Sequence, residues 1–328
     1  MNIAILGAGA WGTALAIHFA PRHQVTLWSR NPEHISSMSS DRQNARYLPG
    51  HSIPSTLKLE SDLDAACRNA ELLIISVPTA GFRPMLHAIA DKSLPLIWVC
   101  KGLEPGTGKR LDEVAAEVLP SNLPRAVLSG PSFAQEVAAG HPTALTLASS
   151  NAEFAKRIAS RLHGGSLRIY TSEDVIGVEI GGALKNVMAI AAGISDGLGF
   201  GHNARAALIT RAAAEMARLG IALGAHTETI MGLTGMGDLI LTCTGELSRN
   251  RQVGLKLAEG KTLPEILLEL GHVAEGVNTA REAIKLADQF GVDMPITGAV
   301  KHILFDSLPA RQAVEDLLSR SQKAENQF

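Results

Sequence analysis

The stretch that decides the fold is residues 1–16, MNIAILGAGAWGTALA. Within it, Asn2 to Leu6 is a short apolar run that predicts a buried strand, and the pattern of Ala10 to Ala20 predicts a helix. A G-x-G-x-x-G motif joins the two elements and consists of Gly7, Gly9 and Gly12. In such a motif the first glycine permits a tight turn, the second lets a pyrophosphate approach the backbone, and the third lets helix and strand pack closely. The motif therefore predicts a dinucleotide site, with a glycine turn of some other α/β fold as the alternative.

Short apolar runs alternate with helical periodicity through the first half of the chain. Further strands are predicted at Gln24 to Trp28, Glu71 to Val77, Leu96 to Cys100, Ala126 to Leu128 and Ala144 to Leu147. Helices are predicted at Asp62 to Arg68, Phe82 to Ala90 and Leu111 to Val118. Continuous apolar strands separated by helices indicate a parallel sheet that is covered on both faces. We therefore expect an α/β protein whose residues 1–172 form a Rossmann-type, doubly wound domain.

Helical spacing replaces the strand pattern from about Ser172 onward. The predicted helices are Glu173 to Ala192, Asn203 to Leu223, Leu263 to Leu270, Thr279 to Phe290 and Ala310 to Gln322. Thr262 and Glu265 have the spacing of a capping box, and Pro264 falls in the first turn, where its missing N–H costs little. We expect residues 173–328 to form an all-helical second domain that packs against the first without a long linker.

The composition excludes several classes of protein. The chain has 328 residues, 46% of them hydrophobic and 19% charged, which favours two folded domains over extensive disorder. A net charge of −2 offers no electrostatic reason to bind nucleic acid. The three cysteines have no CxxC spacing, and no HxxxH or HExxH pair predicts a metal. Charged residues interrupt the apolar stretch 175–194, so no membrane span is expected, and we expect a cytoplasmic protein.

One lysine stands in an apolar, Gly- and Ala-rich stretch. Between Ile176 and Asn203 the formal charges are Glu179, Lys185 and Asp196. On a helix, small residues one turn before and one turn after Lys185 let another molecule approach its ammonium. Loss of hydration lowers a lysine pKa toward the range that is useful for proton transfer. The alternative is a lysine whose stem lies on apolar surface while its head reaches water.

The end of the second strand indicates which cofactor is bound. An NAD-only site places Asp or Glu there to accept the ribose hydroxyl. This chain has Trp28-Ser29-Arg30-Asn31, and its first carboxylate comes only at Glu33. Arg30 can pair with a 2′-phosphate, so NADPH is favoured and NADH is possible; a plain solvated arginine is the alternative.

Polar groups follow two later strands. Lys101 comes directly after the strand that ends at Cys100, where open α/β sheets collect ligands, so it is placed for an anion. Ser132 and Gln135 have capping-box spacing, which predicts a helix start with free N–H groups. A turn and a helix cap without a ligand is the alternative.

The second half contains a block of candidate phosphate and lysine partners. Asp238 follows a Gly-Met-Gly turn and is a carboxylate that could hold a catalytic lysine, and Thr242 comes one turn later. In Ser248-Arg249-Asn250-Arg251 an arginine beside an asparagine offers a guanidinium fork and an amide to a phosphate. Structural capping of the following segments competes with this interpretation.

The residues Gly193 to Gly197 match the G-x-S-x-G nucleophile elbow of hydrolases. That elbow needs a strand before its serine and a helix after it. Here a helix precedes Ser195 and a Gly-rich loop follows, so we do not expect a serine nucleophile.

Taken together, these residues resemble the bacterial NAD(P)-dependent sn-glycerol-3-phosphate dehydrogenase family nearly from end to end. The matching blocks are GAGAWGTALA (7–16), YLP (47–49), KGLE (101–104), LSGPSFAQEVAAGHPTA (128–144), GVEIGGALKNVMAIAAGISDGLGFGHNARAALITR (177–211), GLTGMGDLILTCTGELSRNR (232–251), the loop 273–276 and MPI (294–296). The central block and the SRNR block are specific to this family, whereas many dehydrogenases share the first motif.

The resemblance implies a role for each matching residue. Lys185 is implied as the catalytic general acid and base. The implied substrate-binding residues are Lys101, Gly130, Ser132, Lys185, Asn186, Asp238, Thr242, Ser248, Arg249 and Asn250. The implied cofactor-binding residues are Gly7, Gly9, Ala10, Trp11, Gly12, Arg30, Lys101, Ala134, Arg249, Val273 and Glu275. Relatives often have Ser at the Ala10 position and sometimes Thr at the Ser132 position, and neither departure removes a charged group.

The resemblance also implies a homodimer and a helical second domain like that of phosphogluconate dehydrogenase. The implied reaction interconverts dihydroxyacetone phosphate and sn-glycerol 3-phosphate by NAD(P)H-dependent hydride transfer and supplies glycerol phosphate for phospholipid synthesis. Two alternatives stay open from the sequence: a related two-domain reductase of another small hydroxy or keto acid, and a non-catalytic NAD(P)H sensor.

Overall fold

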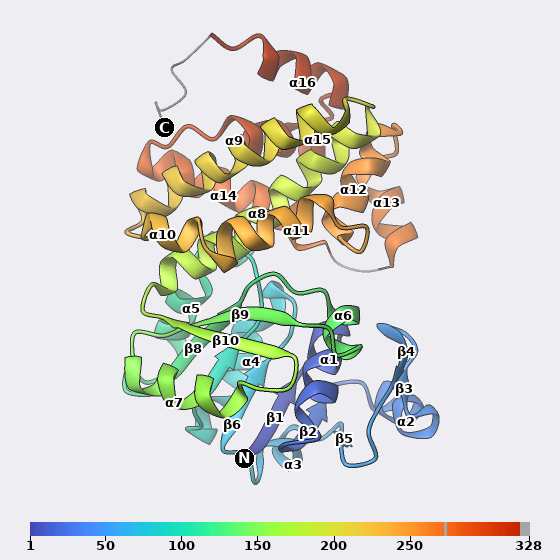
Figure 1. Ribbon diagram of the computed structural model, residues 1–328, viewed down its shortest axis with the longest axis vertical. Helices are drawn as coiled ribbons and strands as arrows, with labels where there is room; N and C mark the ends of the chain where they lie inside the picture. The colour runs from blue at the N-terminus through green and yellow to red at the C-terminus, as the bar shows by residue number, and fades with distance from the viewer. Residues whose placement is uncertain (272–273, 322–328) are drawn as a thin grey trace. The chain divides into compact units, whose positions relative to one another are not determined.

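The computed structural model describes residues 1–271 and 274–321 (Figure 1). The chain divides into two compact units. The first contains residues 1–100 and 112–175, and the second contains residues 101–111 and 176–328. The sequence predicted one boundary near residue 172. The two units divide at residues 175–176, and residues 101–111 also belong to the second unit, which the sequence did not predict.

The first unit is built on an eight-stranded sheet of order β10-β9-β8-β7-β6-β1-β2-β5. Its strands are β1 Asn2–Leu6, β2 Gln24–Trp28, β5 Lys58–Glu60, β6 Leu72–Ile75, β7 Leu96–Trp98, β8 Arg125–Ser129, β9 Thr143–Ala148 and β10 Leu167–Ser172. A separate two-stranded antiparallel pair joins β3 Gln43–Asn44 and β4 Leu48–Ser52. The six strands from β5 to β8 in the sheet order run parallel, but β9 pairs antiparallel with β8 and parallel with β10. The expected parallel sheet is therefore correct for β1, β2, β6, β7 and β8 and wrong for β9, while β5 and β10 were not predicted as strands.

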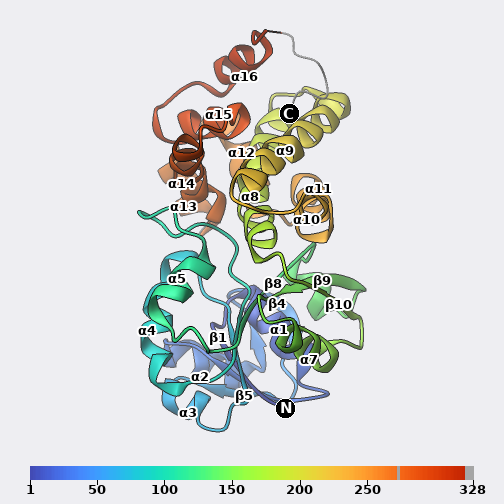
Figure 2. The same cartoon turned by 90° about the vertical axis from the view of Figure 1, so that its left-hand side faces the viewer.

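Helices cover both faces of this sheet, as Figure 2 shows. They are α1 Ala10–Phe19, α2 Pro32–Asp41, α3 Leu63–Cys67, α4 Phe82–Ile89, α5 Leu111–Val118, α6 Ala134–Ala138 and α7 Ala152–Leu162, with short 3₁₀ turns at Thr79–Gly81 and Ala90–Lys92. Phe19 of α1 and Phe154 of α7 are fully buried in the same apolar cluster as Ile3 and Ile5 of β1. Burial on both faces explains why β1 and its neighbours are uninterrupted apolar runs. The expected Rossmann-type architecture is confirmed.

The second unit is helical. Its elements are α8 Val175–Gly197, α9 Gly201–Ala222, α10 Thr227–Ile230, a π-helical turn Leu233–Gly237, α11 Asp238–Thr244, α12 Arg249–Ala258, α13 Leu263–Leu270, α14 Glu275–Phe290, α15 Pro295–Phe305 and α16 Ala310–Leu318. Thr262 and Glu265 form the predicted capping box at the start of α13, where the Thr262 N–H donates to Glu265 Oε2 at 2.8 Å. The helical second domain expected from the sequence is confirmed.

Helix α8 is the central helix of this unit. Its Gly193 faces Gly254 of α12, and a Cβ on either glycine would lie 2.1 Å from a backbone oxygen of the other helix. Only glycine permits backbones to cross this closely. Among the described residues, α8 is the helix with the length and hydropathy of a membrane span, but 83% of its apolar window is buried inside the protein. That burial is typical of a core helix.

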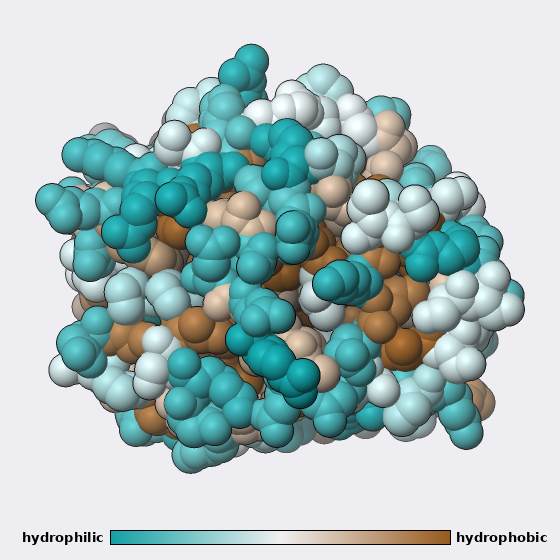
Figure 3. Space-filling view, turned by 90° about the horizontal axis from the view of Figure 1, so that it is seen from below, coloured by the Kyte–Doolittle hydropathy of each residue, from teal (hydrophilic) through white to brown (hydrophobic). Residues whose placement is uncertain are grey.

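The face on which the N-terminus and α3 lie shows mainly hydrophilic side chains, with apolar patches between them (Figure 3). Such a mixture is ordinary for a surface that faces water, since apolar atoms contribute more than half of most protein surfaces. This face does not indicate a specialised binding surface.

Candidate functional site

The glycine-rich loop after β1 has the geometry that its motif predicts. Gly7 has a φ of +123°, and a Cβ there would lie 2.2 Å from the Ser76 carbonyl oxygen. A Cβ on Gly12 would lie 2.0 Å from the Gly7 oxygen, so helix and loop pack without a side chain between them. Gly9 is different, because nothing lies within 4 Å of the position of its Cβ. The space over Gly9 is therefore open to a ligand that approaches the backbone.

The N-terminus of α1 follows this loop and fits an anionic group. Gly9 is its N-cap, no side chain caps the first turn, and that turn contains no acidic residue. The first N–H groups of a helix and its dipole together favour a phosphate at such an end. Ala10 and Trp11 of α1 pack in one cluster with Ala134 of α6, so three of the predicted cofactor residues lie together. The indole N–H of Trp11 is buried and has no hydrogen-bond partner among the described residues.

The end of β2 presents an arginine rather than a carboxylate. Trp28 is buried, and its indole donates to the Ser61 carbonyl at 3.0 Å. Arg30, two residues later, is exposed, and Asn31 caps α2 by accepting from the His34 N–H at 3.1 Å. Glu60 of β5 stands beside Trp28 in the sheet, but its Oε1 accepts the Ser61 and Asp62 N–H groups at 2.9 and 3.0 Å. This arrangement agrees with a site that can accept a 2′-phosphate.

The segment after β8 differs from its prediction. Gly130 has a φ of +140° and the Ser132 hydroxyl donates to the Gly130 carbonyl at 3.0 Å. Helix α6 begins at Ala134 with Phe133 as its N-cap and without a side-chain cap. The predicted capping box of Ser132 and Gln135 is therefore wrong, because the helix starts one residue later than that spacing requires. Gly130 and Ser132 belong to the first unit, whereas the other predicted substrate residues belong to the second.

In the second unit two lysines share one buried carboxylate. We call Lys101, Lys185 and Asp238 the lysine centre. Lys185 Nζ lies 2.5 Å from Asp238 Oδ1, and Lys101 Nζ lies 2.7 Å from Asp238 Oδ2. Lys185 also donates to Thr242 Oγ1 at 3.0 Å. The side chains of Lys185, Asp238 and Lys101 are 9%, 1% and 14% exposed, so water screens their charges poorly. The ammonium of Lys185 has three donors, and no third acceptor contacts it among the described residues.

A π-helical turn brings Asp238 to Lys185. The turn Leu233–Gly237 runs directly into α11, whose first residue is Asp238. Gly181 of α8 lets this turn approach, since a Cβ there would lie 2.7 Å from the Thr234 oxygen. Lys185 follows Gly181 by one turn of α8 and so meets Asp238.

Burial lowers the pKa of Lys185 to about 8. The negative charge of Asp238 opposes this shift, and the positive charge of Lys101 adds to it. The direction agrees with the expectation from the apolar sequence around this lysine. A group with a pKa near 8 exchanges a proton readily at neutral pH, which suits a general acid and base.

Two asparagine amides continue the network away from the lysines. Asn186 donates to the carbonyl oxygens of Lys101 and Gly182, at 3.4 Å in each case. Asn250 donates to Asn186 Oδ1 at 2.9 Å and accepts the Gly276 N–H at 3.0 Å. The amide oxygen of Asn250 is therefore occupied inside the protein. These bonds join α8, α12 and the start of α14, where Glu275 lies; Val273 lies outside the described residues.

The two arginines of the SRNR block have different surroundings. Ser248 caps α12 by accepting the Arg251 N–H at 3.2 Å. Arg251 donates from Nε and one terminal nitrogen to Asp196 Oδ2 at 2.9 and 2.6 Å, so its guanidinium is occupied. Arg249 is exposed and makes no hydrogen bond to any residue that the structure describes. Of the two, Arg249 is therefore the one able to bind a phosphate.

Ser195 lies inside α8, which continues to Gly197, and its side chain is buried. The G-x-S-x-G match is not an elbow, as the sequence indicated, although the expected glycine-rich loop starts only after Gly197. Asp196 was visible in the sequence as one of three charges in an apolar stretch. Its role as the partner of Arg251 was not predicted. Residues 1–271 and 274–321 contain no cluster of three or more His, Cys, Asp or Glu side chains that could hold a metal.

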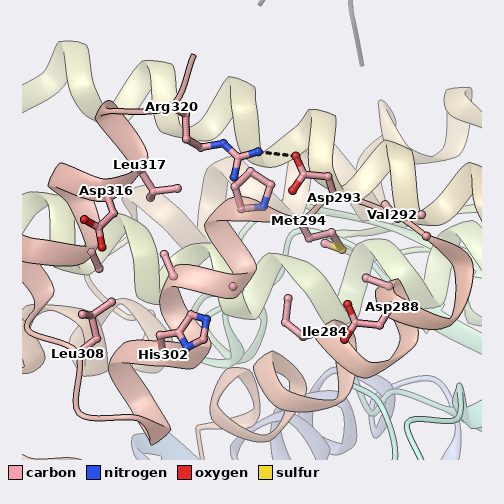
Figure 4. Close-up of a pocket in the computed structure, with 16 residues that line it drawn as sticks. Ile284, Asp288, Val292, Asp293, Met294, His302, Leu308, Asp316, Leu317 and Arg320 are labelled. Carbon is pink, nitrogen blue, oxygen red and sulfur yellow. Dashed lines mark hydrogen bonds and ion pairs between the residues drawn. The ribbon is translucent and has the colours of Figure 1, made fainter. Parts of the chain in front are cut away.

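A cavity of about 620 Å³ lies elsewhere in the second unit, between α14, α15 and α16 (Figure 4). Arg320 and Asp293 form an ion pair of 2.6 Å at its edge. None of the predicted site residues lines this cavity. The lysine centre and the cavity are therefore separate features.

Comparison with known proteins agrees with this geometry. The family model described as NAD-dependent glycerol-3-phosphate dehydrogenase N-terminus matches residues 2–155, and the corresponding C-terminus model matches residues 174–315. A glycerol-3-phosphate dehydrogenase (NAD(P)+) of Thiobacillus denitrificans is 58% identical over 327 residues, covering 99% of this chain and 100% of that protein.

Solved structures show the same relationship. The crystal structure of glycerol-3-phosphate dehydrogenase from Coxiella burnetii has a TM-score of 0.93 and 44% identity, covering 97% of this chain and 99% of that chain. A D-mandelate dehydrogenase with NADH has a TM-score of 0.60 at 16% identity over 97% of this chain and 100% of its own, a likeness of fold alone. The chain belongs to the NAD-dependent glycerol-3-phosphate dehydrogenase family.

Proposed function

We propose that this chain is an oxidoreductase that interconverts dihydroxyacetone phosphate and sn-glycerol 3-phosphate with NAD(P)H or NAD(P)+. The observation that carries the proposal is the buried ammonium of Lys185, which Asp238 and Thr242 hold while one of its N–H groups has no described partner. The names of the family and of its relatives support the same substrate. The mandelate dehydrogenase likeness supports only a common fold. In the reducing direction the product would supply phospholipid synthesis.

Lys185 acts as the proton donor in this proposal. Reduction places negative charge on the carbonyl oxygen at C2 of the ketone, and an ammonium beside that oxygen stabilises the charge and then donates its proton. In the oxidising direction the neutral amine accepts the hydroxyl proton. Asp238 and Thr242 hold the nitrogen in place, so the reaction does not have to order it.

Positive groups of the second unit would bind the phosphate. Arg249 is exposed at the start of α12 and offers a fork to a phosphate, and the α12 N-terminus adds its N–H groups. Lys101 adds charge beside Asp238. Asn186 uses both amide hydrogens in bonds to carbonyl oxygens, whereas Asn250 uses only one, in its bond to Asn186. We propose that Asn250 contacts the substrate through its other amide hydrogen and Ser248 through its hydroxyl. Asn186, Gly130 and Ser132 are further proposed substrate contacts.

The dinucleotide is held by the first unit in this proposal. When bound, its reduced nicotinamide supplies the hydride that the ketone carbon accepts. The open space over Gly9 and the uncapped start of α1 fit a pyrophosphate. Ala10, Trp11 and Ala134 are proposed to line the site beside it, and Arg30 is proposed to bind a 2′-phosphate. Lys101, Arg249, Val273 and Glu275 are further proposed cofactor contacts.

The proposed function is tested by one assay. Purified protein is mixed with NADPH, and absorbance near 340 nm is followed with dihydroxyacetone phosphate as the sole acceptor. We expect substrate-dependent oxidation, and no oxidation with dihydroxyacetone, which lacks the phosphate. Tight NADPH binding without turnover would instead indicate a sensor, and turnover of unphosphorylated keto acids would indicate a different reductase.

The pKa of Lys185 sets the expected pH dependence. Reduction needs the ammonium, so its kcat/KM should be constant below pH 8 and fall about tenfold per pH unit above it. Oxidation needs the neutral amine, so its kcat/KM should rise through the same pH and level off above it. Initial rates in both directions between pH 6.5 and 9.5 measure this. Two profiles without an inflection between pH 7 and 9 would contradict the assignment of Lys185.

Replacement of Arg30 tests the cofactor preference. Arg30→Ala should weaken NADPH binding about tenfold or more, since a charge-assisted bond to the 2′-phosphate is lost, and should change NADH binding little. Kd values for both cofactors measure the difference. Equal losses for the two cofactors would refute the role of Arg30.

We also propose a homodimer, as the family resemblance implies. Light scattering during gel filtration should give about twice the chain mass of 34.6 kDa. A single-chain mass at micromolar concentration would overturn this proposal.

A further inference from the structure

Asn44 is a fully buried polar residue of the first unit that the proposed reaction does not use. It lies in the two-residue strand β3, and all of its amide groups are engaged. Its Nδ2 donates to the Ala8 carbonyl at 3.0 Å and to Thr13 Oγ1 at 2.8 Å. Its Oδ1 accepts the Tyr47 N–H at 3.2 Å and contacts His34 Nε2 at 3.1 Å. Four bonds to one buried side chain indicate a fixed orientation.

The amide nitrogen of Asn44 holds the glycine-rich loop through its two hydrogen bonds. Ala8 lies between Gly7 and Gly9, so a bond to its carbonyl restricts the two flexible residues beside it. Thr13 is fully buried on the inner side of α1. Because one amide nitrogen bonds both groups, it sets the loop against the start of α1. The direction of the loop N–H groups depends on that placement.

The amide oxygen of Asn44 contacts His34, which lies in the segment that follows β2. His34 lies in the first turn of α2, three residues after the Asn31 cap and four after Arg30. The His34 ring also meets the Tyr47 ring edge to face at 5.3 Å. When His34 carries its proton on Nε2, it donates to Asn44 Oδ1. One side chain thus joins the loop beside Gly9 to the segment that presents Arg30.

We infer that Asn44 is a positioning residue for the cofactor, which sets the pyrophosphate loop relative to the segment that reads the 2′ position. This inference rests on the proposed dinucleotide site. It requires asparagine in particular. An aspartate of the same shape would turn a carboxylate oxygen toward the Ala8 carbonyl, and two acceptors would then face each other in a buried place.

The test is Asn44→Asp in the full chain, with Kd values for NADPH and NADH measured by titration without substrate. We expect both Kd values to rise about tenfold or more, because the loop loses its placement for the group that both cofactors share. The KM for dihydroxyacetone phosphate at saturating NADPH should stay within about twofold, since no residue of the lysine centre is changed. A general structural defect would change the cofactor Kd values and the KM for dihydroxyacetone phosphate together.

A matched control is Asn151→Ala. Asn151 belongs to the same unit and caps α7 by accepting the Phe154 N–H at 2.9 Å. Its loss should lower the melting temperature and leave both Kd values unchanged. Cofactor affinities of Asn44→Asp within twofold of wild type would overturn the inference. Equal rises in Kd for the two variants at equal loss of melting temperature would overturn it as well.

His34→Phe serves if Asn44→Asp does not fold. It keeps a ring against Tyr47 and removes only the bond to Asn44, on a partly exposed residue. The NADPH Kd should rise several-fold with little change in melting temperature. An unchanged Kd would refute the inference. If the wild-type protein bound neither cofactor, the proposed function would fail instead.

Discussion

Lys185→Ala is expected to reduce turnover of dihydroxyacetone phosphate by about 10²–10⁴-fold, the contribution of a placed proton donor. The effect should be large because the described part of the site holds no second buried cation in the same position; Lys101 binds the other oxygen of Asp238. The Kd of NADPH should stay nearly unchanged, since the proposed dinucleotide contacts lie mainly in the other unit. Steady-state kinetics and a cofactor titration measure the two quantities.

Lys185→Met provides the control for this variant. Methionine fills most of the space of the lysine stem and avoids the cavity that alanine would leave in a buried site. Both variants should lose turnover equally if the charged nitrogen is what matters. Near-normal turnover in either of them would mean that the proton comes from another group.

Asp238→Asn is expected to affect both stability and chemistry. The buried carboxylate supplies the negative charge that both ammonium groups contact, and removing it leaves buried positive charge uncompensated at a cost of about 3 kcal/mol. The same change removes the charge that raises the Lys185 pKa, so that pKa should fall below its wild-type value of about 8. Urea unfolding and the pH profile of the reduction rate measure these effects.

The pH profile separates this role from a purely structural one. In Asp238→Asn the fall in the reduction rate should begin at a lower pH than in wild type, because the ammonium loses its proton earlier. As a control, Asp306→Asn changes a surface carboxylate that pairs with Lys301, and neither stability nor the profile should change appreciably. An unshifted profile in Asp238→Asn would exclude Asp238 as the group that tunes Lys185.

Much of the fold was predictable because its central strands are buried on both faces. The bounds of β1 and β2 agree with the sequence prediction, since an uninterrupted apolar run has few other interpretations. β10 was missed because its Arg168 and Tyr170 are exposed and its pattern resembles a polar edge. The direction of β9 was not predictable, since an apolar run has no signature of its direction. The short helices α10 to α12 follow turns too closely to show a helical period.

The site residues that the sequence revealed are charged side chains with apolar or glycine-rich neighbours in the chain. Lys185 and Asp238 were found in this way, and their contact was anticipated. The bond of Lys101 to Asp238 was not, because the two residues are 137 positions apart and the sequence contains no sign that residues 101–111 join the helical unit. Ser132 was misassigned as a cap because that spacing has meaning only when the helix start is known. Asn44 was missed because nothing in its neighbouring residues marks it as buried.

Because residues 101–111 belong to the second unit, a single cut in the chain cannot separate the two units. Leu103 is buried among residues of α8 and its neighbours, the Gly106 N–H donates to Glu282 of α14 at 3.2 Å, and Lys101 reaches Asp238. A gene fragment cut near residue 172 would therefore carry this stretch without its packing partners. The complementary fragment would lack Lys101, and it would expose the apolar surface against which Leu103 packs. A chimera that takes its C-terminal half from a relative must therefore also take residues 101–111 from that relative.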